Sequence, residues 1–143
     1  MEKSLSNLPE LIQEAYGYKK QNPEQLSPLT LAFIGDTVFD LIVRTRVILR
    51  GNAQVNKLHK SASSVVNATA QAKLIHELLP MLTEEEMGIF RRGRNAKSHT
   101  TAKNASVSDY KTAMGFEALL GWLYLKGDID RITELVLPLL KNR

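Results

Sequence analysis

Two long apolar segments, each carrying a single acidic residue, constrain this fold more than any other feature of the sequence. The first covers residues 29–39 around Asp36, and the second covers residues 114–121 around Glu117. A carboxylate in a segment that folding buries is costly unless a metal, a cation or several hydrogen bonds compensate it. The pattern therefore predicts two central helices whose acids face one cleft and serve a function there.

Start and stop signals along the rest of the chain predict helices and almost no strands. Ser27 and Pro28 are typical of a helix start, and the apolar pattern that follows continues to about Arg50, where Gly51 ends it. Beyond this helix we expect one bent helix or two in series over 53–79, a short helix from a Thr83–Glu86 capping box to about Arg92, a helix from Ser106 or Ser108 to Leu125, and a final amphipathic helix after Gly127. The fold class is all-α, a helical bundle over residues 26–143, preceded by an extension over residues 1–25 that contains one short amphipathic helix.

Length and composition narrow the class of protein. A chain of 143 residues is long enough for one domain, and 43% hydrophobic residues are enough for its core. The absence of cysteine excludes disulfides and thiolate zinc sites. The apolar runs fall short of a membrane span and no signal peptide begins the sequence, so we expect a cytoplasmic protein without a membrane partner. A net charge of +4 suits a polyanionic partner, although a mildly basic cytosolic protein would show the same value.

A cluster of basic residues lies between the two acidic segments. It begins near the expected end of the short helix and extends into a predicted loop over residues 93–105. The candidate nucleic-acid contacts in it are Arg91, Arg92, Arg94, Asn95, Lys97, Ser98 and Lys103. Arginine binds phosphate through two hydrogen bonds at once, although a favourable position at a helix C-terminus would also explain the first two arginines. Lys57 and Lys60 form a weaker second group, which solvation of a helix surface explains equally well.

The surroundings of each acid suggest magnesium but leave structural roles open. Asp36 has no basic residue one turn later; Asp40 stands there instead, and a divalent cation would relieve the repulsion. Asp40 itself has Arg44 one turn on, so a helical ion pair competes with a metal role. Glu117 is the only charged residue in a long apolar run. The alternatives for Asp36 are a solvated stripe or an ion pair with a basic residue of another helix, and the alternative for Glu117 is a buried polar network.

The two acidic segments and the basic cluster together resemble the ribonuclease III family. Phe33-Ile34-Gly35-Asp36-Thr37-Val38 resembles its signature helix, and Phe116-Glu117-Ala118-Leu119-Leu120-Gly121 resembles its second acidic motif. With residues 91–98, these motifs are similar in order to the Mini-III group, which lacks a double-stranded-RNA-binding domain. The resemblance covers roughly residues 28–140. Two of the four acids of full-length family enzymes are replaced here, by Ala32 and Met114, so only Asp36 and Glu117 correspond.

The resemblance implies a homodimeric endoribonuclease that cuts double-stranded RNA and leaves short 3′ overhangs. Asp36 and Glu117 would be catalytic and would hold Mg²⁺, with Mn²⁺ able to substitute and Asp40 a weaker third ligand. The Mini-III group implies maturation of the 23S (large-subunit) ribosomal RNA precursor. Loss of two acids favours one alternative, a non-catalytic RNA-binding module of ribosome assembly on the same fold. A second alternative is an all-α dimerisation protein whose acids are structural.

Overall fold

The fold consists of helices arranged around two central ones, as the sequence predicts. The computed structural model describes residues 7–97 and 106–141, and all regular structure in these residues is helical. In chain order the elements are α1 (Leu8–Tyr16), the 3₁₀ turn η2 (Pro23–Gln25), α2 (Pro28–Arg50), α3 (Val55–Val66), α4 (Ala68–Leu78), the 3₁₀ turn η3 (Leu79–Met81), α5 (Glu84–Asn95), α6 (Val107–Leu125) and α7 (Ile129–Leu140). No helix within the described residues is both long and apolar enough to cross a membrane.

Capping side chains set the helix boundaries. The Ser27 hydroxyl accepts a hydrogen bond from the Thr30 amide at the start of α2, and Ser106 does the same for α6. Thr83 and Glu86 form the expected capping box at the start of α5. Asn67 has extended backbone geometry and separates α3 from α4. Residues 53–79 therefore form two helices in series rather than one bent helix. Each cap satisfies amide groups that a helix leaves without an internal partner.

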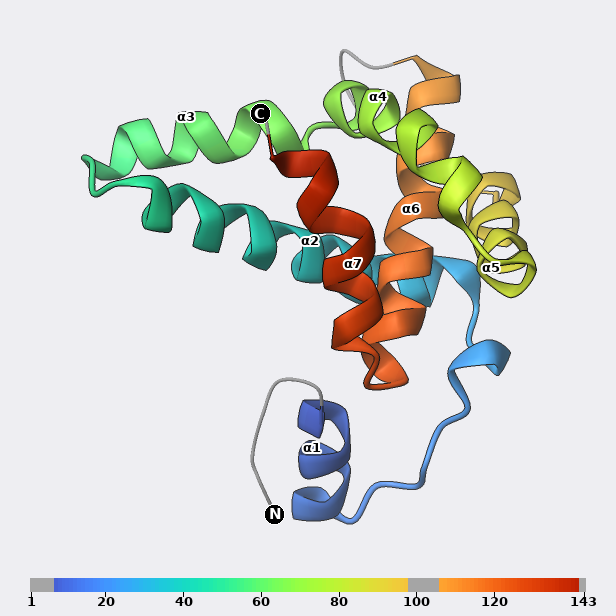
Figure 1. The fold of residues 1–143 in the computed structure, drawn as a ribbon. Coiled ribbons are helices and arrows are strands. Elements are labelled where there is room, and N and C mark those ends of the chain that lie inside the picture. The colour runs from blue at the N-terminus through green and yellow to red at the C-terminus, as the bar shows by residue number, and fades with distance from the viewer. Residues whose placement is uncertain (1–6, 98–105, 142–143) are drawn as a thin grey trace.

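The core forms where α6 is enclosed by its neighbours. This helix crosses α2 at the centre of the molecule and also packs on α4 and α5, while α7 runs along one face of the bundle beside α6 (Figure 1). From Thr112 to Tyr124 every residue of α6 is buried except Met114 and Glu117, which are half-buried. Phe39 of α2 meets Phe116 of α6 edge to face, with ring centroids 5.1 Å apart. The Glu117 side of α6 is thus the side where this buried helix approaches the surface.

A buried ion pair fastens α7 to α5. The Arg131 guanidinium donates two hydrogen bonds of 2.8 Å to the Glu86 carboxylate, one to each oxygen, and a third of 3.0 Å to the Met81 carbonyl. Glu86 is only 5% exposed, and the Arg131 hydrogen bond holds its pKa below the ordinary value. Removing Arg131 would leave the Glu86 carboxylate buried without its cation, so this pair keeps α7 in place.

The N-terminal extension contacts the bundle at only a few points. In Figure 1, α1 stands apart from the bundle and a long connection joins it to α2. Arg92 of α5 fixes the end of this connection by donating hydrogen bonds to the carbonyls of Glu24 (3.1 Å) and Leu26 (3.3 Å). The extension therefore approaches α2 along a defined path, while its helix buries none of its own residues.

Candidate active site between α2 and α6

Two glycines allow α2 and α6 to approach backbone to backbone. A Cβ atom added to Gly35 would overlap the Glu117 carbonyl group, and one added to Gly121 would overlap the Leu31 carbonyl oxygen and lie 2.8 Å from its carbon. Such contacts are closer than the 3.5–4.0 Å at which carbon atoms ordinarily meet. Because Gly35 precedes Asp36 and touches the backbone of Glu117, this close approach brings the two acids together.

The two carboxyl groups interact directly across the helix interface. Partial burial, the negative charge of Asp36 and a hydrogen bond between the two side chains raise the pKa of Glu117 to about 8. A hydrogen bond between two carboxyl groups requires a proton on one of them, and the raised pKa places that proton on Glu117 near neutral pH. The segment around Asp36 packs into the core as expected, but the Asp36 side chain itself is exposed, unlike that of Glu117.

The neighbouring acid is already paired. The Arg44 Nε atom lies 3.0 Å from a carboxylate oxygen of Asp40, one helical turn away. This is the helical ion pair that the sequence predicts as the alternative to a metal-binding role for Asp40. Within the described residues there is no group of three or more acidic or histidine side chains arranged to hold a metal. The candidate ligands are therefore Asp36 and Glu117 alone, with Asp40 directed to Arg44.

Apolar residues stand at the two positions where full-length enzymes of the family carry further acids. Ala32 is 4% exposed and packs within the core. Met114 is half-buried and lies one turn before Glu117 on the same side of α6, where it packs against the core. A metal held by the remaining pair would therefore take most of its coordination shell from water and substrate.

The basic cluster begins on a helix rather than in a loop. Helix α5 continues through Gly93, Arg94 and Asn95, so the prediction that the loop starts at residue 93 is wrong. The reason is packing: a Cβ on Gly93 would lie 2.7 Å from the Ala118 Cβ and 2.9 Å from the Gly115 Cα of α6. This contact holds the last turn of α5 against the part of α6 that carries Glu117.

The predicted RNA contacts fall into different settings. Arg91, Asn95 and Lys97 are exposed, and Arg94 is half-buried with its guanidinium over the Phe90 ring, 5.8 Å from the centroid. Arg92 is exposed too, but two of its guanidinium nitrogens are engaged with the N-terminal connection, a role that no local sequence signal reveals. Ser98 and Lys103 lie outside the described residues.

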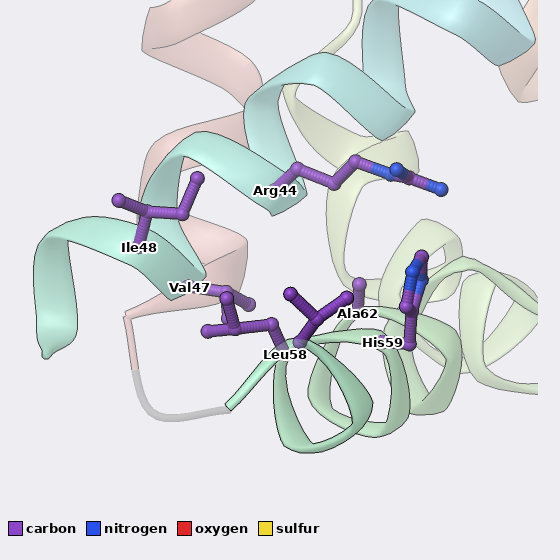
Figure 2. Close-up of a pocket in the computed structure, with 7 residues that line it drawn as sticks. Arg44, Val47, Ile48, Leu58, His59 and Ala62 are labelled. Carbon is purple, nitrogen blue, oxygen red and sulfur yellow. The ribbon is translucent and has the colours of Figure 1, made fainter. Parts of the chain in front are cut away.

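The second basic group lies elsewhere. Lys57 and Lys60 are exposed on α3, which packs along the C-terminal half of α2, on the opposite side of the molecule from α5 (Figure 1). The two basic groups thus do not form one continuous cluster with the acids. Helix α3 contributes instead to a pocket of about 140 Å³ against α2, shown in Figure 2, with an apolar wall and Arg44 and His59 at its edge. Neither Asp36 nor Glu117 lines it.

Comparison with known proteins agrees with this arrangement. The family model described as "Ribonuclease III domain" matches residues 29–128, which include both acids and the last turn of α5. The chain belongs to the ribonuclease III family. Two curated relatives, both called Mini-ribonuclease 3, are similar in sequence to most of this chain. That of Symbiobacterium thermophilum is 49% identical, over 80% of this chain and 88% of its own length, and that of Clostridium tetani is 46% identical, over 83% and 80%.

The fold agrees at the level of structure. A crystal structure of a protein from Fusobacterium nucleatum superimposes with a TM-score of 0.75 at 30% identity, over 82% of this chain and 93% of that one. The resemblance seen in the sequence is thus confirmed, including its all-α fold. The chain is a ribonuclease of the ribonuclease III type.

Proposed function

We propose that this ribonuclease cuts double-stranded RNA with a site built on Asp36 and Glu117. The observation that carries the proposal is the contact between these two carboxyl groups, held together by the close packing of α2 and α6. The ribonuclease III family acts in general on double-stranded RNA and depends on a divalent metal. An open surface suits a duplex substrate, and the exposed position of Asp36 supports this.

The two acids fit a magnesium ion, with manganese as a substitute. Mg²⁺ prefers oxygen ligands and commonly binds through one or two carboxylates, several waters and substrate phosphate oxygens. Burial is the main cause of the raised pKa of Glu117 and the negative charge of Asp36 adds to it, so a cation between the two acids would favour the charged form of Glu117. When bound, the metal would activate water and stabilise charge on the phosphate. Asp36 and Glu117 would orient that metal, and Glu117 must lose its proton to do so.

The last turn of α5 is the proposed phosphate-binding surface. Arg91, Arg94 and Asn95 lie on it, beside the segment of α6 that carries Glu117, and Lys97 follows two residues after its end. Duplex RNA is bound mainly through its backbone and shape, so a few cations next to the acids suffice to align a strand. Ser98 and Lys103 continue this segment in the sequence, and Lys57 and Lys60 would contact a more distant part of a duplex.

The same proposal includes a homodimer. Helix α2 exposes large apolar side chains to solvent, among them Phe33 at 81% and Leu49 at 80%. Single chains seldom leave such a surface uncovered unless a partner binds there. A two-fold dimer would offer identical sites to two antiparallel strands. Phe33 lies three residues before Asp36, so a partner on this surface would sit beside the acids.

The biological substrate is proposed from the relatives. In the Mini-III group the implied role is maturation of the 23S ribosomal RNA precursor, which would place this enzyme in the bacterial cytoplasm. The extension over residues 1–25 and the catalytic domain over residues 26–143 remain the proposed division of the chain.

Cleavage of a long RNA duplex tests the proposal. We expect cuts in Mg²⁺ or Mn²⁺ and none with a chelator. Asp36→Asn and Glu117→Gln should each lose cleavage while the thermal melt stays cooperative. Asp40→Asn is the matched control, since it removes an acid one turn from Asp36 and should keep most activity. Near-normal cleavage by Asp36→Asn or Glu117→Gln would refute the assigned site.

A further inference from the structure

The N-terminal extension carries two exposed tyrosine rings side by side. Tyr16 and Tyr18 are 69% and 63% exposed, and their ring centroids lie 5.5 Å apart with the planes tilted by 35°. Tyrosine is enriched at interfaces because its large ring contributes contact area there while its hydroxyl stays in water. Two such rings that form one patch, rather than scattered single residues, are typical of a contact surface.

The end of helix α1 holds this pair in place. Gly17, between the two tyrosines, has a left-handed backbone with φ of 65°. The Tyr18 amide donates a hydrogen bond of 3.0 Å to the Gln13 carbonyl, and the Gly17 amide donates one of 3.4 Å to the Glu14 carbonyl. This helix ending turns the chain back, so that Tyr18 meets Tyr16. The backbone thus arranges the rings before a ligand arrives, which lowers the entropy cost of binding.

Two lysines follow the rings directly. Lys19 and Lys20 are exposed, and residues 15–23 contain no acidic residue. Neither lysine forms an ion pair within the described part of the chain. With Tyr18 they line a hollow of about 580 Å³ beside the turn between α6 and α7. The other charged residues around this hollow are Lys126, Glu10 and Glu14. Rings next to cations suit a ligand that has both flat apolar faces and negative charge.

Unpaired RNA has both properties. Its bases present flat faces that stack on aromatic side chains, and its phosphates attract lysine. A duplex does not offer the same contact, because its bases are stacked on one another and only their edges and the backbone face outward. An acidic peptide would match the lysines, but it has no regular series of flat rings for the tyrosines. The combination therefore favours a single strand of RNA.

The extension leads from these rings to the proposed phosphate-binding surface. Glu24 follows Lys20 by four residues, a span of at most about 14 Å. The Glu24 carbonyl accepts a hydrogen bond of 3.1 Å from Arg92, which lies in the last turn of α5 with Arg94. An RNA strand that leaves a duplex bound at this turn would therefore pass close to the tyrosine pair.

We propose that Tyr16, Tyr18, Lys19 and Lys20 form a second RNA-binding surface, which holds unpaired nucleotides that flank the duplex. The inference rests on the proposed function, because the bound duplex supplies the strand that continues to the rings. It narrows the substrate class to a duplex with an unpaired flank. It also gives a role to the N-terminal extension, which lies before the residues matched by the family model. The tyrosines touch no reacting atom, so they affect which RNA binds and not the rate of cutting.

Two duplexes with the same paired sequence test this surface. One is blunt, and the other has single-stranded tails of about eight nucleotides at both ends, within the roughly 4–16 nucleotides that such surfaces cover. Binding to the full-length chain is measured in Ca²⁺, so that the RNA stays uncut. We expect the tailed duplex to bind about tenfold more tightly than the blunt one, because its bases stack on the rings.

Variants of the four residues identify the source of that preference. Tyr16→Ala/Tyr18→Ala should abolish it, whereas Tyr16→Phe/Tyr18→Phe, the matched control, keeps both rings and should keep the preference. Lys19→Gln/Lys20→Gln should reduce the slope of log affinity against log salt concentration for the tailed duplex by about 0.7 per lost phosphate contact. The same slope for the blunt duplex should not change.

Cleavage of the blunt duplex in Mg²⁺ separates this inference from the proposed function. Its rate should be the same for the natural chain and for both tyrosine double variants. Equal binding of tailed and blunt duplexes by the natural chain, or a tail preference that survives Tyr16→Ala/Tyr18→Ala, overturns the second RNA-binding surface alone. A chain that cleaves neither duplex overturns the proposed function, and the binding assay still decides on the surface because it requires no cleavage.

Discussion

Substitution of Gly121 by alanine tests whether the spacing between α2 and α6 controls catalysis. The added Cβ would overlap the Leu31 carbonyl oxygen and lie 2.8 Å from the Leu31 carbonyl carbon, about 1 Å inside the ordinary contact distance. Both atoms belong to the backbone, so relief requires the helices to separate by about that amount. Gly121 lies one turn after Glu117, so Asp36 and Glu117 would move apart with them.

The expected loss is large for a residue that touches no substrate. A misplacement of about 1 Å at a reacting centre costs roughly 100-fold in rate, and overpacking costs about 1–3 kcal/mol of stability. We therefore expect the Gly121→Ala enzyme to remain folded, to cleave duplex RNA about 100-fold more slowly, and to need a higher Mg²⁺ concentration for half-maximal rate. Single-turnover cleavage across a Mg²⁺ series, with a thermal melt of the same sample, measures all three quantities.

Gly88→Ala is the control for this experiment. Gly88 lies within α5, and a Cβ there would meet nothing within 4 Å. This substitution should leave cleavage unchanged and raise stability by up to about 1 kcal/mol, since alanine favours the helix. If the Gly121→Ala enzyme cleaved as fast as the Gly88→Ala enzyme at every Mg²⁺ concentration, the helix spacing would not control the site.

Three further predictions concern charge. Without metal, the folded protein keeps the Glu117 proton between pH 4.5 and about 8, whereas the unfolded chain releases it there. The free energy of unfolding should therefore fall as pH rises through this range. In denaturant titrations, Glu117→Gln should remove this pH dependence. The double variant Arg94→Ala/Lys97→Ala should bind uncut duplex more weakly in Ca²⁺. The slope of its log affinity against log salt concentration should fall in magnitude by about 0.9 per lost phosphate contact. Arg92→Ala should leave that slope unchanged and lower the free energy of unfolding by about 1–2 kcal/mol. Arg131→Ala should destabilise by about 3 kcal/mol in thermal melts without altering RNA affinity, because it leaves a buried carboxylate unpaired.

Local signals explain why the helices could be predicted from the sequence. Ser27, Thr83 and Ser106 each cap the helix that follows, and such a cap involves residues only three positions apart. The pairing of Asp40 with Arg44 is equally local. The apolar periodicity of the final helix also corresponds to its buried face in the structure. In these cases the residues that decide the structure are neighbours in the sequence.

Contacts between distant residues explain what could not be predicted. Arg92 binds carbonyl groups 66 and 68 residues away, and Arg131 reaches Glu86 across 45 residues. The sequence shows such arginines only as charges. The position of Gly93 also depends on a distant contact. In the sequence it looks like the start of a loop, yet α5 includes it because only a glycine fits against α6 there. Exposure of Asp36 likewise depends on which side of α2 the other helices leave open.

The glycines and the acids of this site depend on one another. Each glycine within a helix costs about 1 kcal/mol relative to alanine, and α2 and α6 accept this cost at Gly35 and Gly121. The gain is an approach close enough for the charge of Asp36 to act on Glu117, although like charges repel. Packing of the surrounding core, including the Phe39–Phe116 contact, holds the helices together against this repulsion. The two acids therefore stay close together even when no cation is bound, because the packing of the two backbones fixes the distance between Asp36 and Glu117.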